Sequence, residues 1–160
     1  MRKTWKRARA LVACCLAAVL GVGTLSGASA ADLSAGSYDQ GLWAEYYKDE
    51  TFASYGTGRQ ESDINHQWTA SVTPPGMTSQ EHFSARYTGR IQAPESGTYI
   101  FYLNIDDGAK MWIDGNLKIN DAGPHGASEK TAVVSLEKGA YYDFTIEHYN
   151  RYGDGTLQLS

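Results

Sequence analysis

Cysteine is nearly missing from this chain: the two cysteines stand side by side at positions 14 and 15. Both lie in a segment typical of a signal peptide, with a basic start, an apolar run from Leu11 to Val22 and the small residues Ala28-Ser29-Ala30. We expect residues 1–30 to be removed by cleavage after Ala30. The mature chain would then form no disulfide, although its destination is oxidising. Lipidation at Cys14 is not expected, because the apolar run follows that cysteine instead of preceding it.

Long hydrophobic runs are also missing. A membrane span needs about 20 apolar residues, and the run in the leader is shorter, so we expect a secreted protein with no membrane insertion. Losing the leader removes five of the 14 Lys and Arg and none of the 18 Asp and Glu, which leaves a net charge of −9. That charge argues against nucleic acid and anionic membranes as partners. It suits a cation site or a neutral polar ligand, although acidity alone would also aid solubility.

No window shows a helical repeat, and the pattern that is present has period two. Residues 31–40 are small and polar and are expected to be a linker, while residues 41–160 form one domain. Strands are predicted at 41–47, 82–93, 98–105, 109–113, 117–119, 131–136, 142–148 and 156–160, with loop-like stretches at 48–63 and 120–130. Short strands at near-regular spacing, separated by Gly and Asp-Gly turns, indicate an all-β fold, an antiparallel β-sandwich or barrel.

Asp106 and Asp107 are the most informative pair of residues. They stand where an apolar strand ends, and neighbouring side chains of a regular strand point to opposite faces, so both could reach one ion only at a distorted turn. Two carboxylates at one point suit Ca²⁺, which binds oxygen ligands. The plainer interpretation is an ordinary Asp-Gly turn at Asp107-Gly108.

Several motifs in order resemble a known family. They are Gly41-Leu42-Trp43-Ala44-Glu45-Tyr46-Tyr47, the segment 83–91, Pro94-Glu95-Ser96-Gly97, Asp106-Asp107-Gly108 with Ile113-Asp114-Gly115, the turn 136–139, and Glu147-His148-Tyr149. Together they resemble the PA-14 domain, a protective-antigen-type module of bacterial toxins, glycosidases and flocculin-like adhesins. The resemblance covers residues 41–160 and implies a β-sandwich.

The resemblance also implies a site. In lectin-like members the paired Asp join through a cis peptide and hold Ca²⁺ together with a second loop, and two vicinal sugar hydroxyls complete the coordination. Here the second loop would be 150–155. The implied metal ligands are the side chains of Asp106, Asp107, Asn150 and Asp154 and the carbonyls of Arg151 and Gly153. Alternatively, this loop only turns the chain, with Gly153 and Gly155 supplying positive φ.

Ligand contacts are expected from residues near these loops: Asp106, Asp107, Tyr149, Tyr152, Asp154 and His125. The bulky pair Arg151-Tyr152 stands where many members of the family have a glycine-rich run, so this loop departs from the family pattern where the sugar would bind. Among the tryptophans, Trp43 and Trp68 are assigned to core packing, and Trp112 to either a core or a binding role. Asp114 is assigned to a hairpin. Asp121 is a candidate for an additional ligand contact at the rim of the metal site, although no motif singles it out.

Catalysis and zinc are not expected. The four histidines do not occur at zinc-ligand spacings. No nucleophile elbow or phosphate loop is present. A cation between Asp106 and Asp107 would keep both ionised, which is unsuitable for a general acid. The leading hypothesis is a secreted calcium-dependent carbohydrate-binding domain, lectin or adhesin-like, that binds cell-surface glycans. The alternatives are a structural or protein-contact module, or the accessory module of a longer carbohydrate-active enzyme. The oligomeric state is open.

Overall fold

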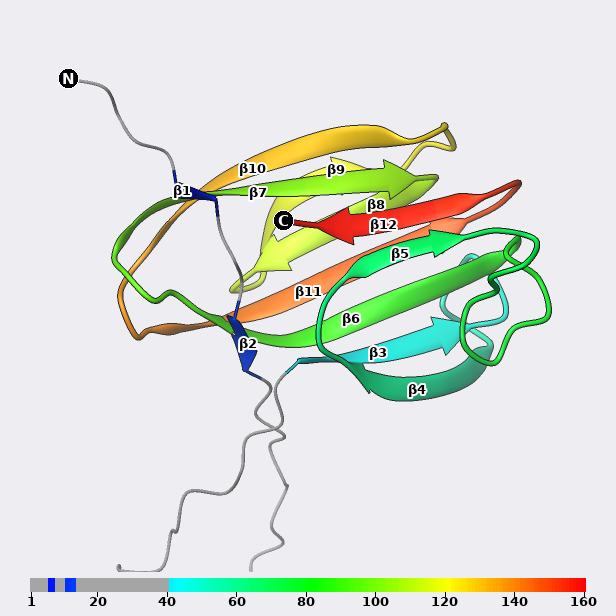
Figure 1. Cartoon of the computed structure of the whole chain (residues 1–160), viewed down its shortest axis with the longest axis horizontal. Helices are drawn as coiled ribbons and strands as arrows, with labels where there is room; N and C mark the ends of the chain where they lie inside the picture. Colours follow the sequence, from blue (N-terminus) through cyan, green and yellow to red (C-terminus); the bar gives the residue numbers. More distant parts are fainter. Residues whose placement is uncertain (1–5, 8–10, 14–40) are drawn as a thin grey trace, which may run out of the picture.

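The computed structural model describes residues 6–7, 11–13 and 41–160, and these residues form β-strands joined by turns and loops, with no helix (Figure 1). Most of the predicted signal peptide and the whole predicted linker 31–40 lie outside the described residues. Within the described part of the chain, no helix is long and apolar enough to cross a membrane.

Two sheets make up the fold. The first has the order β1 (Lys6–Arg7), β7 (Gly97–Asp106), β12 (Gly155–Leu159) and β5 (Asn65–Trp68), with β10 (Ser128–Leu136) also paired to β7. The second has the order β4 (Tyr55–Glu61), β3 (Leu42–Tyr47), β6 (Phe83–Gln92), β11 (Tyr141–Asn150), β8 (Gly108–Ile113) and β9 (Asn116–Asp121), with β2 (Leu11–Ala13) paired to β6. Every pairing between these described strands is antiparallel except β1 with β7.

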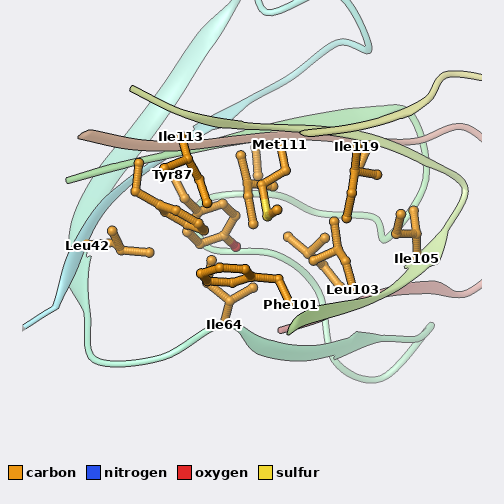
Figure 2. Close-up of a cluster of buried hydrophobic side chains, with 14 of the residues drawn as sticks. Leu42, Ile64, Tyr87, Phe101, Leu103, Ile105, Met111, Ile113 and Ile119 are labelled. Carbon is orange, nitrogen blue, oxygen red and sulfur yellow. The ribbon is translucent and has the colours of Figure 1, made fainter. Parts of the chain in front are cut away.

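The core lies between the two sheets and follows the predicted alternation. On β7 the buried side chains are Tyr99, Phe101, Leu103 and Ile105, and those between them are partly exposed. Strands β6 and β11 of the other sheet contribute Phe83, Ala85 and Tyr87, and Phe144, Ile146 and His148. Figure 2 shows part of this cluster, with Phe101, Leu103 and Ile105 facing Tyr87, Met111 and Ile113. The predicted antiparallel all-β class is therefore confirmed, and the two sheets sharing one core are consistent with a sandwich.

The predicted hairpin across Asp114 and Gly115 is also present. These two residues connect β8 to β9 and have φ values of 49° and 70°. Positive φ at both central residues is the conformation of the type I′ turn, which suits Asp-Gly because glycine carries no side chain.

Two sequence-based predictions are wrong. The stretch 48–63 was expected to be loop-like, but it contains β4. This strand is at the edge of its sheet, and only Glu61 among its residues is buried, so it carries no hydrophobic alternation. Trp43 was assigned to the core, but its side chain is on the outer face of β3 and is 38% exposed. Trp68 is in the core, as predicted, and is 3% exposed.

Candidate functional site

Asp106 and Asp107 lie where the chain passes from one sheet to the other. Asp106 is the last residue of β7, and β8 begins at Gly108 in the other sheet. The peptide bond between the two Asp residues is cis, as the family resemblance implies. Asp107 is buried at 6% exposure, and Asp106 is partly exposed.

The Asp107 carboxylate holds two loops. Its Oδ1 accepts the backbone N–H of His125 at 3.0 Å, and its Oδ2 accepts the backbone N–H of Arg151 at 2.8 Å. The segment 122–127, between β9 and β10, and the segment 151–154, between β11 and β12, are thereby fixed to the same carboxylate. Because each carboxylate oxygen has a further lone pair, these bonds leave Asp107 able to bind another cation or donor.

Asp106 has a different environment. Burial and the negative charge of Asp107 raise the pKa of the Asp106 carboxyl, while a bond from the Ala127 backbone acts in the opposite direction. Burial is the largest of these causes, and the charge of His125 lowers the pKa in part, so the pair still carries concentrated negative charge. The carbonyl oxygen of Asp106 accepts a bond from Nε2 of the buried His148 at 2.9 Å.

Asn150 is the residue of the second loop with the clearest unused acceptor atom. Its side chain is fully buried, and its amide nitrogen donates to the carbonyls of Gln80 at 2.7 Å and Gly153 at 3.2 Å. Its Oδ1 is buried and has no hydrogen-bond partner among the described residues. Exchanging the amide oxygen and nitrogen would not remove this defect, because the oxygen would then face two carbonyls. The pairing of Tyr149 with Gly108 places Asn150 next to Asp107 across the two strands.

The carbonyls expected as ligands are already used within the protein. The carbonyl of Arg151 accepts the backbone N–H of His82 at 3.3 Å, and that of Gly153 accepts the Asn150 amide. Each carbonyl retains a second lone pair, so the contacts do not exclude metal binding. Gly153 has a φ of 74°, so its predicted positive φ is present. The positive φ predicted for Gly155 is wrong; a Cβ at this residue would instead make a tight contact of 3.1 Å with Asn150 Cγ.

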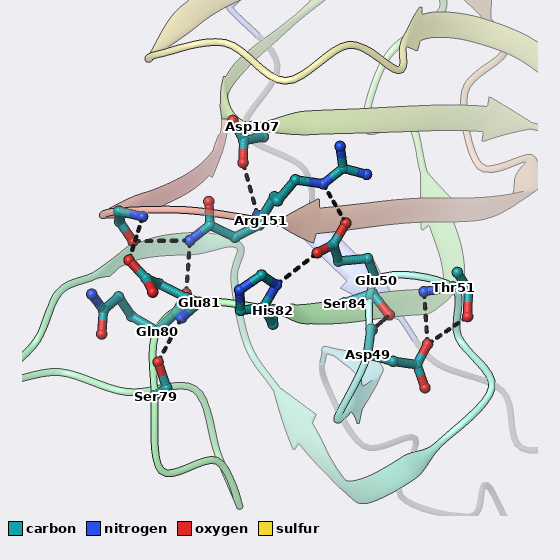
Figure 3. A network of polar contacts seen from close by, with 12 residues as sticks. Asp49, Glu50, Thr51, Ser79, Gln80, Glu81, His82, Ser84, Asp107 and Arg151 are labelled. Carbon is teal, nitrogen blue, oxygen red and sulfur yellow. Dashed lines mark hydrogen bonds and ion pairs between the residues drawn. The ribbon is translucent and has the colours of Figure 1, made fainter.

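Three residues that the sequence did not suggest hold the second loop in place (Figure 3). Glu50 accepts from Arg151 Nε at 2.6 Å and lies 2.8 Å from His82 Nδ1. Glu81 accepts the backbone N–H of Gly153 at 2.7 Å. No local motif marks these residues, because each acts through a loop distant in sequence.

The remaining predicted ligand contacts occupy different positions around the Asp pair. Tyr149 is half-buried, and its hydroxyl donates to the carbonyl of Ala122 at 2.7 Å. Tyr152 is 66% exposed and its ring is edge-on to His82. The ring of His125 is held within its own loop by Asp121 Oδ2 at 2.8 Å and the Gly126 carbonyl at 2.7 Å.

Asp154 is the predicted ligand of the second loop that carries a carboxylate. Its side chain is exposed, and its negative charge contributes to the raised pKa of Asp106. In residues 41–160 and the two short N-terminal strands, no group of three or more His, Cys, Asp or Glu side chains is placed to hold a metal ion. The oxygen groups that the Asp pair and the second loop offer are carboxylates, one buried amide oxygen and backbone carbonyls. Such an all-oxygen set suits Ca²⁺ and not zinc, which prefers histidine nitrogen and cysteine sulfur.

Comparisons with known proteins identify the same family as the sequence motifs. A family model described as the PA14 domain matches residues 39–160, which confirms the resemblance drawn from the motifs. The anti-sigma-I factor RsgI3 of Acetivibrio thermocellus is 34% identical over 119 residues, which are 74% of this chain and 18% of that protein. The chain thus spans about a fifth of the length of this curated relative.

Two solved structures illustrate the range of similarity. An anti-sigma factor domain-containing protein from Clostridium clariflavum superposes with a TM-score of 0.68 at 30% identity, over 74% of this chain and 41% of that one. The epithelial adhesin 9 A domain of Candida glabrata, solved in complex with Galb1-4GlcNAc, gives a TM-score of 0.62 at 12% identity, over 74% of this chain and 80% of that one. The second likeness is one of fold alone.

Proposed function

The chain belongs to the PA14 domain family, and we propose that it is a secreted, calcium-dependent carbohydrate-binding module of the lectin or adhesin type. Asp106 and Asp107 would bind the ion with their carboxylates, and the loop 150–154 would complete its shell from the other side. Bound calcium would supply a hard Lewis acid on which two neighbouring sugar hydroxyls replace water. A cell-surface or polysaccharide glycan is the proposed partner.

The observation that carries this proposal is the buried Oδ1 of Asn150. A buried amide oxygen without a partner costs free energy, about 1–3 kcal/mol in mutational data. A cation bound beside Asp107 would satisfy this oxygen and would also stabilise the Asp106 carboxylate, whose pKa is raised by burial and by the charge of Asp107. One ion would therefore account for two otherwise unfavourable features of the same site.

The residues of the protein have separate roles in this proposal. Asp107 positions the segments 122–127 and 151–154, through the backbone N–H groups of His125 and Arg151. Glu50 and Glu81 position the second loop through Arg151 and Gly153. Tyr152, which is largely exposed next to His82, is the side chain best placed to contact a bound sugar from the rim.

Calcium titration by calorimetry tests the metal site. The wild-type protein should release or absorb heat on binding, and Asp106→Asn should lose most of this heat because it removes one of the two proposed carboxylate ligands. The variant should keep its fold, since the Asp106 carboxylate holds no loop other than through Ala127. Asp143→Asn is the matched control, because Asp143 is exposed and paired with Arg90 on the outer face of β11. Equal heats for the wild type and Asp106→Asn would refute the proposal.

A glycan array with and without a chelator tests the sugar. Binding that disappears in chelator and in Asp106→Asn is the expected result. A second candidate function is a structural or protein-contact module, as part of a longer protein. It is favoured by the engagement of both Asp107 oxygens within the protein, which would fix the loops without an ion. A folded protein with no calcium heat and no glycan on the array would support this candidate.

A further inference from the structure

The outer face of the first sheet carries three amide side chains joined in a row. Asn104 Nδ2 donates to Gln158 Oε1 at 3.1 Å, and Gln158 Nε2 donates to Asn65 Oδ1 at 2.9 Å. These residues are direct neighbours across β7, β12 and β5. Asn104 lies between the buried Leu103 and Ile105, so its side chain is on the face that points away from the core.

The amide row lies in a groove of about 620 Å³. Besides the three amides, the groove is lined by Tyr102, which is partly exposed and on the same face of β7 as Asn104. Asp63 and Glu129 also line it, and Glu129 is opposite Asn104 on β10. From β5 to β10 the groove crosses four strands, which at the usual spacing is about 14 Å.

The row holds its amides in fixed orientations and leaves hydrogen-bonding groups unused. Each amide has an oxygen with two lone pairs and a nitrogen with two N–H donors. The two bonds of the row use only one donor on Asn104, one acceptor on Asn65 and one of each on Gln158. Donors and acceptors therefore alternate along the groove, which is the arrangement needed to bind successive hydroxyl groups that both donate and accept.

We propose that this groove binds a neutral oligosaccharide without calcium, as a second carbohydrate site separate from the Asp106-Asp107 pair. The alternating amide groups would bind the hydroxyls, and Tyr102 would supply apolar ring surface and a further hydroxyl. The carboxylates of Asp63 and Glu129 bias the groove against anionic chains and leave neutral ones unaffected. None of the groove residues is a candidate calcium ligand, so this site does not depend on the metal.

Calorimetry in chelator tests the proposal on the full chain, with cellohexaose, xylohexaose, mannohexaose and hexagalacturonate as probes. At least one neutral hexasaccharide should bind, and the anionic one should not. Asn65→Ala and Gln158→Ala should each weaken binding about tenfold, the loss expected for one to two hydrogen bonds. Gln67→Ala is the matched control, because Gln67 is an exposed amide on the same strand and does not line the groove. It should bind as the wild type does.

Gln158→Glu keeps the size of the side chain and should also weaken binding, which guards against a folding defect in the alanine variant. Four results would overturn the proposal. The first is no neutral hexasaccharide binding in chelator. The second is a loss in Gln67→Ala equal to that in Asn65→Ala. The third is concentration-dependent self-association that Gln158→Ala abolishes, which would make this face a contact between copies of the chain. Sugar binding that needs calcium and disappears only in Asp106→Asn would support the calcium site and reject this one.

Discussion

Nε2 of His148 lies 2.9 Å from the carbonyl oxygen of Asp106, so the side chain of a core histidine supports the first residue of the cis Asp pair. The contact fixes the tautomer: Nε2 carries the proton and donates it, and Nδ1 is buried without a partner among the described residues. The Trp68 ring stacks on the imidazole with centroids 5.3 Å apart. The candidate site is thus anchored from inside the sandwich as well as by its loops.

This histidine should make stability depend on pH. Burial lowers the pKa of His148 to about 4, from about 6.5 in the unfolded chain. Between these values the unfolded state binds more protons, so stability falls as the pH falls through this window, by about 3 kcal/mol in total. Urea unfolding at pH 7.5, 5.5 and 4.5 in chelator should show this loss, and it should be much smaller in His148→Gln, which keeps a donor. Parallel pH profiles for the two proteins would contradict this assignment.

Most of the fold could be predicted because most of its strands bury one face. Strands β6, β7 and β11 carry mostly apolar or aromatic side chains at every second position, and this period is visible in the sequence without knowledge of the partners. Strand β4 was missed because it is held mainly by backbone pairing with β3 and buries almost nothing. Trp43 was misplaced because alternation does not tell which of two strand faces is the core when both carry aromatic residues.

The site could be predicted only where it is local in sequence. Asp106 and Asp107 are adjacent, and the segment 150–155 is a single loop, so the motifs mark both. Glu50 was missed because it precedes its partner Arg151 by 101 residues, and only the folded chain brings the two together. The unpartnered oxygen of Asn150 depends on where its nitrogen donates, which no motif records.

Asp107 should be a stabilising residue even when no metal is added. Its buried carboxylate accepts two backbone N–H groups, and hydrogen bonds to a charged group contribute about 1.5–3 kcal/mol each. Asp107→Ala should therefore lower the free energy of unfolding in chelator by about 2 kcal/mol or more, and Asp107→Asn by less, because an amide oxygen still accepts one of them.

Hydrogen exchange gives a residue-level check of the same prediction. The amide protons of His125 and Arg151 should lose protection in Asp107→Ala, while those in the centre of β7 should keep theirs. Asp143→Asn serves as the control, since Asp143 is exposed on the outer face of β11 and paired with Arg90, away from both N–H partners of Asp107. Unchanged protection at His125 and Arg151 would show that Asp107 does not hold the loops.

The Glu50–Arg151 ion pair should position the second loop while adding little to stability. Arg151 is 44% exposed in its side chain, and exposed ion pairs contribute little because solvent screens the charges and ordering two long side chains costs entropy. A double-mutant cycle with Glu50→Gln and Arg151→Gln should therefore return only a small coupling energy. Calcium affinity should nevertheless fall in Glu50→Gln, because the loop that carries Asn150 and Gly153 would be less ordered. A large coupling energy with unaltered calcium affinity would reverse these roles.

Gly108 should tolerate no side chain as long as Tyr149 is present. A Cβ at position 108 would lie 2.5 Å from Cε1 of the Tyr149 ring, which is closer than atoms in contact can approach. The ring must move, and its hydroxyl then loses the bond to the Ala122 carbonyl. Overpacking of this kind costs about 1–3 kcal/mol, so Gly108→Ala should be destabilising by that amount.

A double-mutant cycle separates this clash from a backbone effect at Gly108. In Tyr149→Ala the space next to residue 108 is open, so adding Gly108→Ala should cost little or even stabilise, since alanine restricts the unfolded chain more than glycine does. The coupling energy between the two changes should therefore be favourable and about as large as the cost of Gly108→Ala alone. If Gly108→Ala were equally destabilising in both backgrounds, the glycine would be required by its backbone conformation and not by the approach of the tyrosine ring.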